Sequence, residues 1–362
     1  MARVDQHACV EVAVVQVVED AVRPDVTVSP DGDAPDVRDW LHHPVSPDAP
    51  SPLVLRLAAL SPREHLLSAH LHHLFADPST LWTVLRDLGE LYGARLGAAP
   101  PDPPTAQYGE YAAYEAESER SNGPRAARWW HDALDGVRFA SPPPTAREPF
   151  ALRRPVLSAE QAGVLRTWAR GRLGTPFAAV LAVLAEEMAG HVTGGDHLLF
   201  ATLFRRRDQP RWRTLAGPCI TPSYAAVPLD ATSDLRRLVL HLAGAERWSR
   251  HPVWELGRVT DTLADPDAFM PFVELIPQLR PEAIPFGPAR AVVEEAAGPR
   301  DTGGATELGI RLRTAVDGSL VAHLSGDGRG WDRRTVHAVL DGLPDRVRDL
   351  VPRRADPAGR PR

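Results

Sequence analysis

The stretch Glu64-His-Leu-Leu-Ser-Ala-His-Leu-His-His-Leu-Phe-Ala-Asp-Pro-Ser-Thr80 decides how the rest of the chain is interpreted. Positions 67, 69, 71 and 73 alternate with positions 68, 70 and 72, which predicts a strand that ends on His72 and His73. Asp77 follows four residues after the second histidine, and Pro78 opens an amphipathic helix. Imidazole titrates near neutral pH, so a histidine held rigidly in a cleft can act as a general base.

Length and composition narrow the class of protein. A chain of 362 residues, 43% of them hydrophobic and 24% charged, is typical of a soluble globular protein with room for two lobes. The formal net charge of −6 argues against nucleic acid as the main partner. No apolar run approaches the roughly 20 residues needed to cross a bilayer, and no signal peptide opens the chain. Cys9 and Cys219 give no disulfide framework. These features predict a cytoplasmic protein with no membrane partner.

Several kinds of catalytic or binding site are excluded because the residues or motifs that they require do not occur in the sequence. All 41 basic residues are arginine. The lack of lysine rules out a Schiff-base lysine and a P-loop lysine. The glycine-rich, nucleophile-elbow and zinc-protease motifs GxGxxG, GxSxG and HExxH do not occur either.

The predicted elements alternate between strand and helix. In the first half, Leu53–Leu60 pairs with the histidine strand as a hairpin, and a helix follows from Pro78. Residues 107–118 and 124–134 are two helices separated by Ser121-Asn-Gly-Pro124. Residues 141–155 form a linker between lobes. The second half has helices at 158–170, 175–190, 233–250 and 332–350, and strands at 197–203, 220–227, 272–276, 308–315 and 320–324. A further strand is expected at 10–18, and the whole is mixed α/β with antiparallel pairs.

The residues His72-His-Leu-Phe-Ala-Asp-Pro78 resemble the HHxxxDG motif of the condensation domains of nonribosomal peptide synthetases, which belong to the chloramphenicol acetyltransferase-like acyltransferase superfamily. Flanking segments are also similar to this family. Gln107–Tyr114 resembles its QYxDYAxW helix, Trp129–Gly136 its YWxxxLxG segment, Arg206–Pro210 with Leu215–Gly217 its GRxxP crossover, and Trp331–Val336 its FDxxTV helix start. The resemblance covers roughly residues 14 to 350.

This resemblance implies an α/β (α+β) fold of two lobes: an N-terminal lobe at 1–145 and a C-terminal lobe at 146–352, with a disordered tail at 353–362. The family's first strand and helix are missing before residue 1, so the first lobe is expected to be incomplete. Three motif positions also differ. Pro78 replaces a glycine, Arg206 a second glycine and Thr221 an asparagine. Pro78 suits the first position of a helix capped by Asp77, although a glycine would allow a closer backbone approach.

The resemblance also assigns roles to the residues of the motif. It makes His73 the catalytic base or orienting group, His72 a structural neighbour, and Asp77 an organising residue held by an arginine, for which Arg207 is the candidate. In the alternative, Asp77 is a plain helix cap and Arg207 lies on a solvated loop. The run Arg205-Arg206-Arg207 could meet a phosphate or a carrier protein, or be an ordinary solvated loop. The histidines of the strand lack the carboxylates or cysteines of a metal site, so no metal is expected.

The implied function is acyl transfer from carrier-protein thioesters, which forms an amide or an ester in nonribosomal peptide or other secondary-metabolite biosynthesis. The partners would be peptidyl or acyl carrier proteins and other synthetase modules, and no cofactor would be bound beyond the phosphopantetheine of those carriers. A second hypothesis is a catalytically degenerate relative that acts as a docking or scaffold module. A third is a truncated product that does not fold unaided, because a missing strand leaves an unpaired sheet edge.

Overall fold

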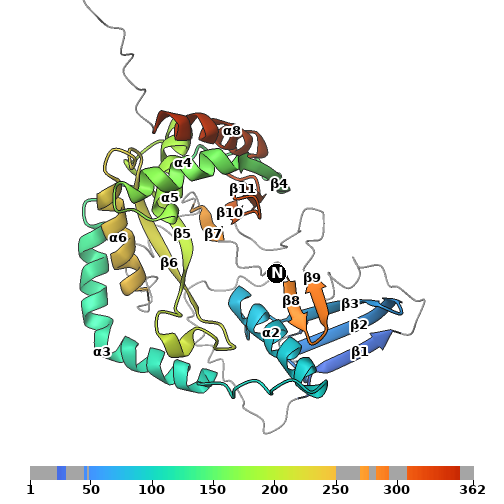
Figure 1. The fold of residues 1–362 in the computed structure, drawn as a ribbon. Helices are drawn as coiled ribbons and strands as arrows, with labels where there is room; N and C mark the ends of the chain where they lie inside the picture. The colour runs from blue at the N-terminus through green and yellow to red at the C-terminus, as the bar shows by residue number, and fades with distance from the viewer. Residues whose placement is uncertain are drawn as a thin grey trace, which may run out of the picture. The chain divides into compact units, whose positions relative to one another are not determined.

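The computed structural model describes residues 23–29, 45–46, 49–249, 270–276, 283–292 and 308–350 (Figure 1). The chain divides into two compact units, Met1–Ala76 and Asp77–Arg362, and each is described by itself. The strand predicted at 10–18 and the tail at 353–362 lie outside the described residues. The lobe boundary expected near residue 145 stays a prediction.

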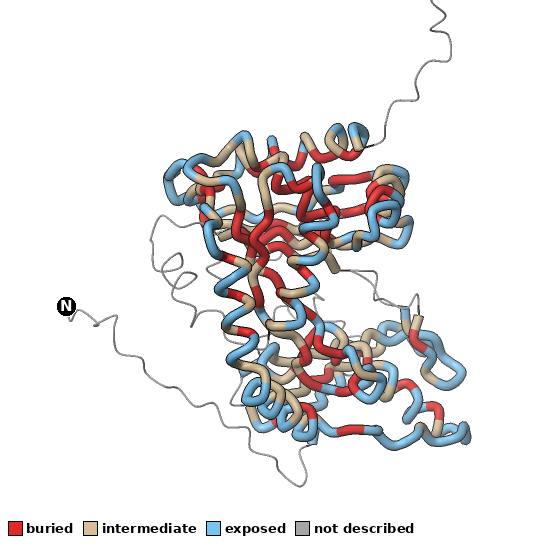
Figure 2. Tube along the Cα trace, turned by 90° about the vertical axis from the view of Figure 1, so that its left-hand side faces the viewer, coloured by how far each residue is buried: buried red, intermediate tan, exposed pale blue. Residues whose placement is uncertain are grey.

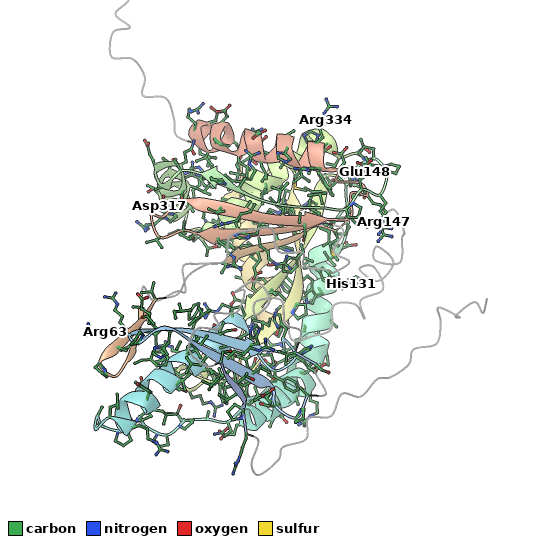
Figure 3. All side chains as sticks on the ribbon, turned by 90° about the vertical axis from the view of Figure 1, so that its right-hand side faces the viewer. Arg63, His131, Arg147, Glu148, Asp317 and Arg334 are labelled. Carbon is green, nitrogen blue, oxygen red and sulfur yellow. The ribbon has the colours of Figure 1, made fainter. Side chains whose placement is uncertain are left out.

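The first unit contributes a small sheet to the described residues. Its three strands are β1 (Asp25–Ser29), β2 (Leu53–Ser61) and β3 (Glu64–Leu71), with β1 parallel and β3 antiparallel to β2. The predicted hairpin is therefore confirmed, and Arg63 lies at its tip (Figure 3). The predicted end of the histidine strand was wrong. The ladder closes on the pair Leu53–Leu71, and the His72 carbonyl accepts a 3.0 Å hydrogen bond from the Phe75 N–H, which turns the backbone away.

The second unit is built on a larger sheet. Within the described residues it has six strands in the order β4 (Phe150–Leu157), β11 (Leu320–Gly326), β10 (Leu308–Thr314), β7 (Phe272–Ile276), β5 (His197–Arg205) and β6 (Ile220–Pro228). The pairs β10–β7 and β5–β7 are parallel, and the other neighbours are antiparallel. The predicted linker at 141–155 was wrong in its second half, which is strand β4. Pro155 is tolerated there because β4 lies at the edge of the sheet, where a missing N–H breaks no essential ladder bond.

Four helices supply the core that covers one face of this sheet: α4 (Ala159–Arg170), α5 (Pro176–Met188), α6 (Leu235–Arg247) and α8 (Arg333–Asp349). Helix α5 is the centre of this core, because nearly every residue from 178 to 185 is fully buried (Figure 2). The predicted caps Ser158 and Thr175 accept hydrogen bonds from the N–H of Gln161 and Ala178. The side chain of Asp332 caps α8 in the same way, and its bonds to Thr335 lower the pKa of this carboxyl.

Within the described residues, this unit has two more α-helices, α2 (Pro78–Arg95) and α3 (Tyr108–Leu134). The prediction of two helices between 107 and 134 was wrong, because α3 continues through Pro124. Helix α2 packs against a hairpin that was not predicted, formed by β8 (Ala283–Phe286) and β9 (Ala289–Val292). A Cβ atom at Gly89 would lie 2.2 Å from the carbonyl oxygen of Pro285, so the close approach of the hairpin requires a glycine at this position.

Candidate functional site

Asp77 begins helix α2 as its N-cap. Its backbone is extended, with φ −104° and ψ 173°, and Pro78 occupies the first helical position, as predicted. The Asp77 Oδ1 atom accepts hydrogen bonds from the N–H of Thr80 at 2.8 Å and from its Oγ1 at 3.0 Å. Thr80 Oγ1 in turn accepts a 3.3 Å bond from the Asp77 N–H, which completes a reciprocal capping box. The substitution of proline for the motif glycine therefore leaves the helix start intact.

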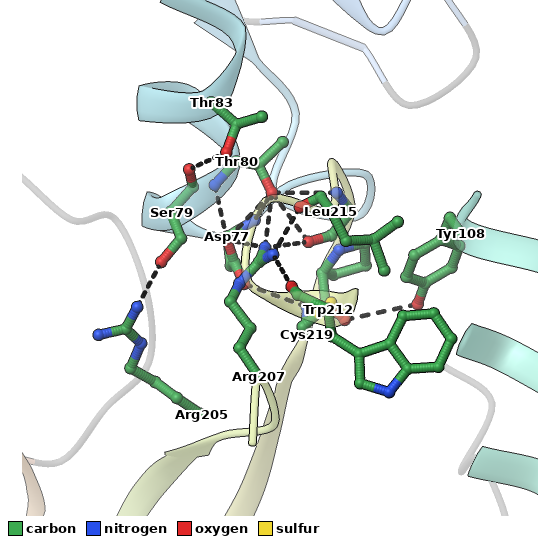
Figure 4. Close-up of polar contacts among 12 residues, drawn as sticks. Asp77, Ser79, Thr80, Thr83, Tyr108, Arg205, Arg207, Trp212, Leu215 and Cys219 are labelled. Atoms are coloured by element: carbon green, nitrogen blue, oxygen red, sulfur yellow. Dashed lines mark hydrogen bonds and ion pairs between the residues drawn. The ribbon is translucent and has the colours of Figure 1, made fainter. Parts of the chain in front are cut away.

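Arg207 meets the same carboxylate from a segment 130 residues away (Figure 4). Its Nη2 lies 2.9 Å from both carboxylate oxygens of Asp77, and its Nε lies 3.3 Å from Oδ2. The remaining guanidinium hydrogens are donated to backbone carbonyls: Nη1 to Trp212 at 3.0 Å and Leu215 at 2.5 Å, and Nη2 to Gly217 at 3.0 Å. The side chains of Arg207 and Asp77 are only 4% and 2% exposed.

This geometry is suited to a structural role. We call the Asp77–Arg207 ion pair, together with its hydrogen bonds to the backbone of residues 212–219, the tie. Each carboxylate oxygen of Asp77 already accepts several hydrogen bonds, including one from the Cys219 N–H to Oδ2 at 3.1 Å. A buried ion pair compensates for its desolvation only when such additional bonds are made. Because both carboxylate oxygens are engaged in these hydrogen bonds, Asp77 is suited to hold helix α2 against residues 207–219. The predicted Asp77–Arg207 contact is confirmed, and the alternative that left Arg207 on a solvated loop is wrong.

The other two arginines of the run have separate partners. Arg206 is buried, and its Nη1 donates to the carbonyl of Glu246 at 2.7 Å, near the C-terminal end of helix α6. A cation is favoured there, because the last carbonyls of a helix carry partial negative charge. Arg205 is exposed and donates from Nη2 to Ser79 Oγ at 2.9 Å. All three arginines therefore have a partner inside the unit and two of them are buried, which corrects the view of the run as a solvated loop.

Sequence reasoning missed Thr80 and the structural role of Gly217. Thr80 Oγ1 also lies 2.8 Å from the Gly217 carbonyl oxygen, to which its single hydroxyl proton can be donated in place of Asp77 Oδ1, and it accepts a hydrogen bond from the Gly217 N–H at 3.1 Å. It therefore joins the two sides of the tie. Gly217 has φ +149°, and a Cβ atom there would lie 2.1 Å from Cδ2 of Tyr108. Burial raises the pKa of the neighbouring Cys219 thiol to about 11, so this thiol is no nucleophile at neutral pH. A threonine three residues after a cap is the signal that could have identified Thr80.

The histidines lie in the first unit, directly after β3. The His72 Nδ1 atom accepts a hydrogen bond from the Leu74 N–H at 3.1 Å, and its ring meets the Phe75 ring edge-on at 6.2 Å between centroids. One nitrogen of His72 is thus engaged with the turn, which agrees with a structural residue. His73 lies in the turn with an exposed side chain. The catalytic role of His73 and the organising role of His72 stay predictions.

Over the ranges that the structure describes, no group of three or more histidine, cysteine, aspartate or glutamate side chains could hold a metal ion. Within the same ranges, no helix is long and apolar enough to cross a membrane.

Solved structures similar to this chain define the class of fold. The X-domain from teicoplanin biosynthesis has a TM-score of 0.65 at 21% identity, over 91% of this chain and 78% of that chain. VibH, a condensation enzyme of nonribosomal peptide synthesis, has a TM-score of 0.66 at 15% identity, over 90% of this chain and 79% of that chain. The SgcC5 protein from Streptomyces globisporus has a TM-score of 0.65 at 18% identity, over 93% of this chain and 82% of that chain. The predicted chloramphenicol acetyltransferase-like α/β class is therefore confirmed.

Sequence comparison identifies the family within this class. Residues 37–239, more than half of the chain, match the family model described as the condensation domain, and the chain belongs to this family. Cyclosporin synthetase from Tolypocladium inflatum is 26% identical over 205 residues, which is 51% of this chain and 1% of that protein. The isonitrile lipopeptide synthase of Mycobacterium tuberculosis is 31% identical over 161 residues, which is 38% of this chain and 6% of that protein. The chain thus spans a small part of the length of these synthetases.

Proposed function

We propose that this condensation domain is an acyltransferase that joins the acyl group of one carrier-protein thioester to the amine, or hydroxyl, of a second carrier-bound substrate. The observation that carries this proposal is the buried tie between Asp77 and Arg207. The tie preserves the start of the motif helix although Pro78 replaces the motif glycine. Membership of the family and the intact sequence His72-His-x-x-x-Asp77 support the same function.

His73 supplies the acid–base chemistry in this proposal. The acceptor nitrogen attacks the thioester carbonyl carbon, so that a C–N bond forms and the C–S bond breaks. The proton lost by the amine passes through the imidazole to the departing thiolate of the phosphopantetheine arm. Asp77 and Arg207 take no part in the proton transfer in this proposal, and the reaction requires no cofactor beyond the arms of the partner carrier proteins. A hydroxyl acceptor gives an ester by the same transfers.

A second candidate function is a docking module without catalytic activity. Two observations favour it: Pro78 removes the close backbone approach that a glycine would allow, and similar structures include a complex of an X-domain with a second protein, OxyB, from teicoplanin biosynthesis. That structure has a TM-score of 0.63 at 21% identity, over 91% of this chain and 76% of that chain. In this case carrier proteins or tailoring enzymes would bind the domain and no acyl group would move.

The two candidates are separated by assay of His73→Ala with a loaded donor carrier and a loaded acceptor carrier. Loss of a general base is expected to lower kcat by about 10²- to 10⁴-fold, with little change in KM for either carrier. His65→Ala, an exposed histidine of β3 outside the motif, is the matched control and should retain the wild-type rate. Product formation by His73→Ala at the wild-type rate would contradict the catalytic role. Wild-type protein that binds carriers without any turnover would favour the docking module.

A further inference from the structure

The loop between α4 and α5 holds a leucine in an unfavourable position. Leu173 has φ +57°, and in the part of the chain that the structure describes it is the one non-glycine residue with positive φ. The residue is also 83% exposed. The left-handed conformation is unfavourable for a residue with a Cβ atom. An exposed leucine also lacks the favourable free energy that burial of its side chain would contribute. Both penalties fall on the same residue, and such strain is a reason to look for function.

The fold requires the turn but does not require a leucine in it. The Leu173 N–H donates to the Arg170 carbonyl at 3.1 Å, and the Gly174 N–H donates to the Ala169 carbonyl at 2.8 Å. These two bonds form a Schellman motif, in which the left-handed residue is usually glycine. Gly174 has a packing reason of its own, because a Cβ atom there would lie 2.8 Å from Cδ2 of Leu235. Leu173 has no such reason.

The charges around Leu173 are positive and partly fixed in place. Arg172 lies over the Trp168 ring with its guanidinium carbon 4.8 Å from the ring centroid, and its Nη1 donates to the Trp168 carbonyl at 3.5 Å. Arg170 is exposed on the last turn of α4. Residues 166–177 contain three arginines and no aspartate or glutamate, in a chain whose formal net charge is −6. A fixed cation beside a projecting apolar side chain is the composition of an interface anchor.

We propose that Arg170, Arg172 and Leu173 form a docking surface for a carrier protein whose contact face is acidic and has an apolar pocket that receives Leu173. The choice of a carrier as the occupant rests on the proposed function, and the choice of an acidic face rests on charge complementarity with the two arginines. The strain at Leu173 pre-positions its side chain, so that little conformational freedom is lost when the complex forms.

Leu173→Gly is the decisive variant, because it removes the side chain and relieves the strained conformation together. Its melting temperature is expected to rise, while its affinity for the carrier falls by about tenfold. Arg172→Glu should weaken binding by a similar factor and reduce the dependence of affinity on salt. Leu91→Ser changes an exposed leucine on helix α2 and should leave affinity unchanged. The measurement is calorimetric titration of each variant with the phosphopantetheinylated donor and acceptor carriers of the acyl-transfer assay, at low and high salt.

Three results of the binding, melting and sedimentation measurements would overturn the proposal. The first is wild-type affinity of Leu173→Gly for both carriers. The second is a fall in melting temperature together with affinity, which would show that Leu173 supports the fold. The third is a wild-type dimer in sedimentation that Leu173→Gly dissociates without loss of carrier binding, which would assign the surface to a second copy of the chain. Binding is measured without turnover, so an inactive enzyme does not affect this test. Conversely, turnover by Leu173→Gly with wild-type KM for both carriers would refute the docking surface alone.

Discussion

The imidazole of His241, on helix α6, is held in its neutral form. Its Nε2 accepts a hydrogen bond from the Ala226 N–H of strand β6 at 3.1 Å, which requires that nitrogen to be unprotonated. The ring of Trp129 lies against it at 5.7 Å between centroids. Burial, followed by electrostatic interactions with His197 and Arg237, lowers the pKa of His241 from 6.5 to about 4. Protonation would therefore break a contact between the sheet and α6.

This environment predicts a loss of stability in mild acid. The pKa is lower in the folded chain than in the unfolded chain, so the contribution of neutral His241 is complete above pH 6.5 and is lost as the pH falls towards 4. The loss is at most about 3 kcal/mol. Glutamine at this position can accept the Ala226 N–H but does not titrate. The difference in unfolding free energy between wild type and His241→Gln, measured by denaturant titration, should change over this range. A pH-independent difference would contradict the assignment.

The contact of a single side chain could be predicted where a family motif contains both residues of the contact. It could not be predicted where the contact depends only on the three-dimensional arrangement of the chain. The resemblance assigned Arg207 to Asp77, and the two side chains are paired. The neighbouring arginines could not be assigned, because the alternation of β5 ends at Arg205 and the following backbone is irregular. Arg206 turns to the carbonyl of Glu246 instead. That contact depends on where α6 ends, which local sequence does not determine.

At the scale of elements, α3 shows how packing overrides a local signal. Proline lacks an N–H and crowds the carbonyl four residues earlier, so Ser121-Asn-Gly-Pro124 predicted a break. The helix nevertheless runs for 27 residues, with buried Tyr111 before this point and buried Trp130 after it. Trp130 Nε1 donates to the carbonyl of Trp248 at 3.3 Å. Pro124 itself is exposed, and it has no N–H to donate to the carbonyl of Arg120.

Replacement of this proline tests whether α3 is continuous. Pro124→Ala restores an N–H that can reach the Arg120 carbonyl, and no buried contact is lost because the ring is exposed. If the helix is continuous, the variant should be more stable by about 1 to 3 kcal/mol, measured by thermal unfolding. Arg128→Ala, at another exposed position of α3, controls for a general effect of alanine. A destabilised or unchanged Pro124→Ala would indicate two helices, as the sequence predicted.

Other elements were predictable to the extent that their signals are local. The helices capped by Ser158, Thr175 and Asp332 and the hairpin across Asp317-Gly318 follow from cap and turn residues, and Figure 3 shows Asp317 at the tip of that hairpin. Strands β8 and β9, with four residues each, were missed because a short apolar run in a proline-rich region has no clear period. Their place is fixed by contact with Gly89, nearly 200 residues earlier in the chain.

For the whole molecule, the class of fold was predictable and the order of strands was not. Alternating elements and antiparallel hairpins indicated mixed α/β, and the described sheets agree. The order β4-β11-β10-β7-β5-β6 places the first and the last strand of this unit side by side at one edge. Such pairings join residues more than 150 positions apart, as in Arg153 opposite His323. Their register depends on the shared core, and no local pattern in either strand specifies it.

The distribution of buried residues predicts unequal stability along the chain. The large core around α5 belongs to the second unit, and Leu181 and Leu184 are completely buried in it. Strand β1 lies at the edge of the small sheet, with Val26 and Val28 already 54% and 64% exposed. Opening α5 exposes a large apolar area, whereas opening β1 exposes little more than is already in contact with water.

Native-state hydrogen exchange, followed by mass spectrometry on peptides that cover 23–29 and 178–188, measures this difference directly. Amides of α5 should exchange only through global unfolding, because each lies inside the core that defines the native state. Amides of β1 that donate to β2 should exchange at least about 100-fold faster, through local opening that leaves the second unit folded. In denaturant, the rates of α5 should rise steeply, and those of β1 should barely change. Equal protection of the two segments would mean that Val26 and Val28 are covered in solution, and that β1 unfolds together with the core.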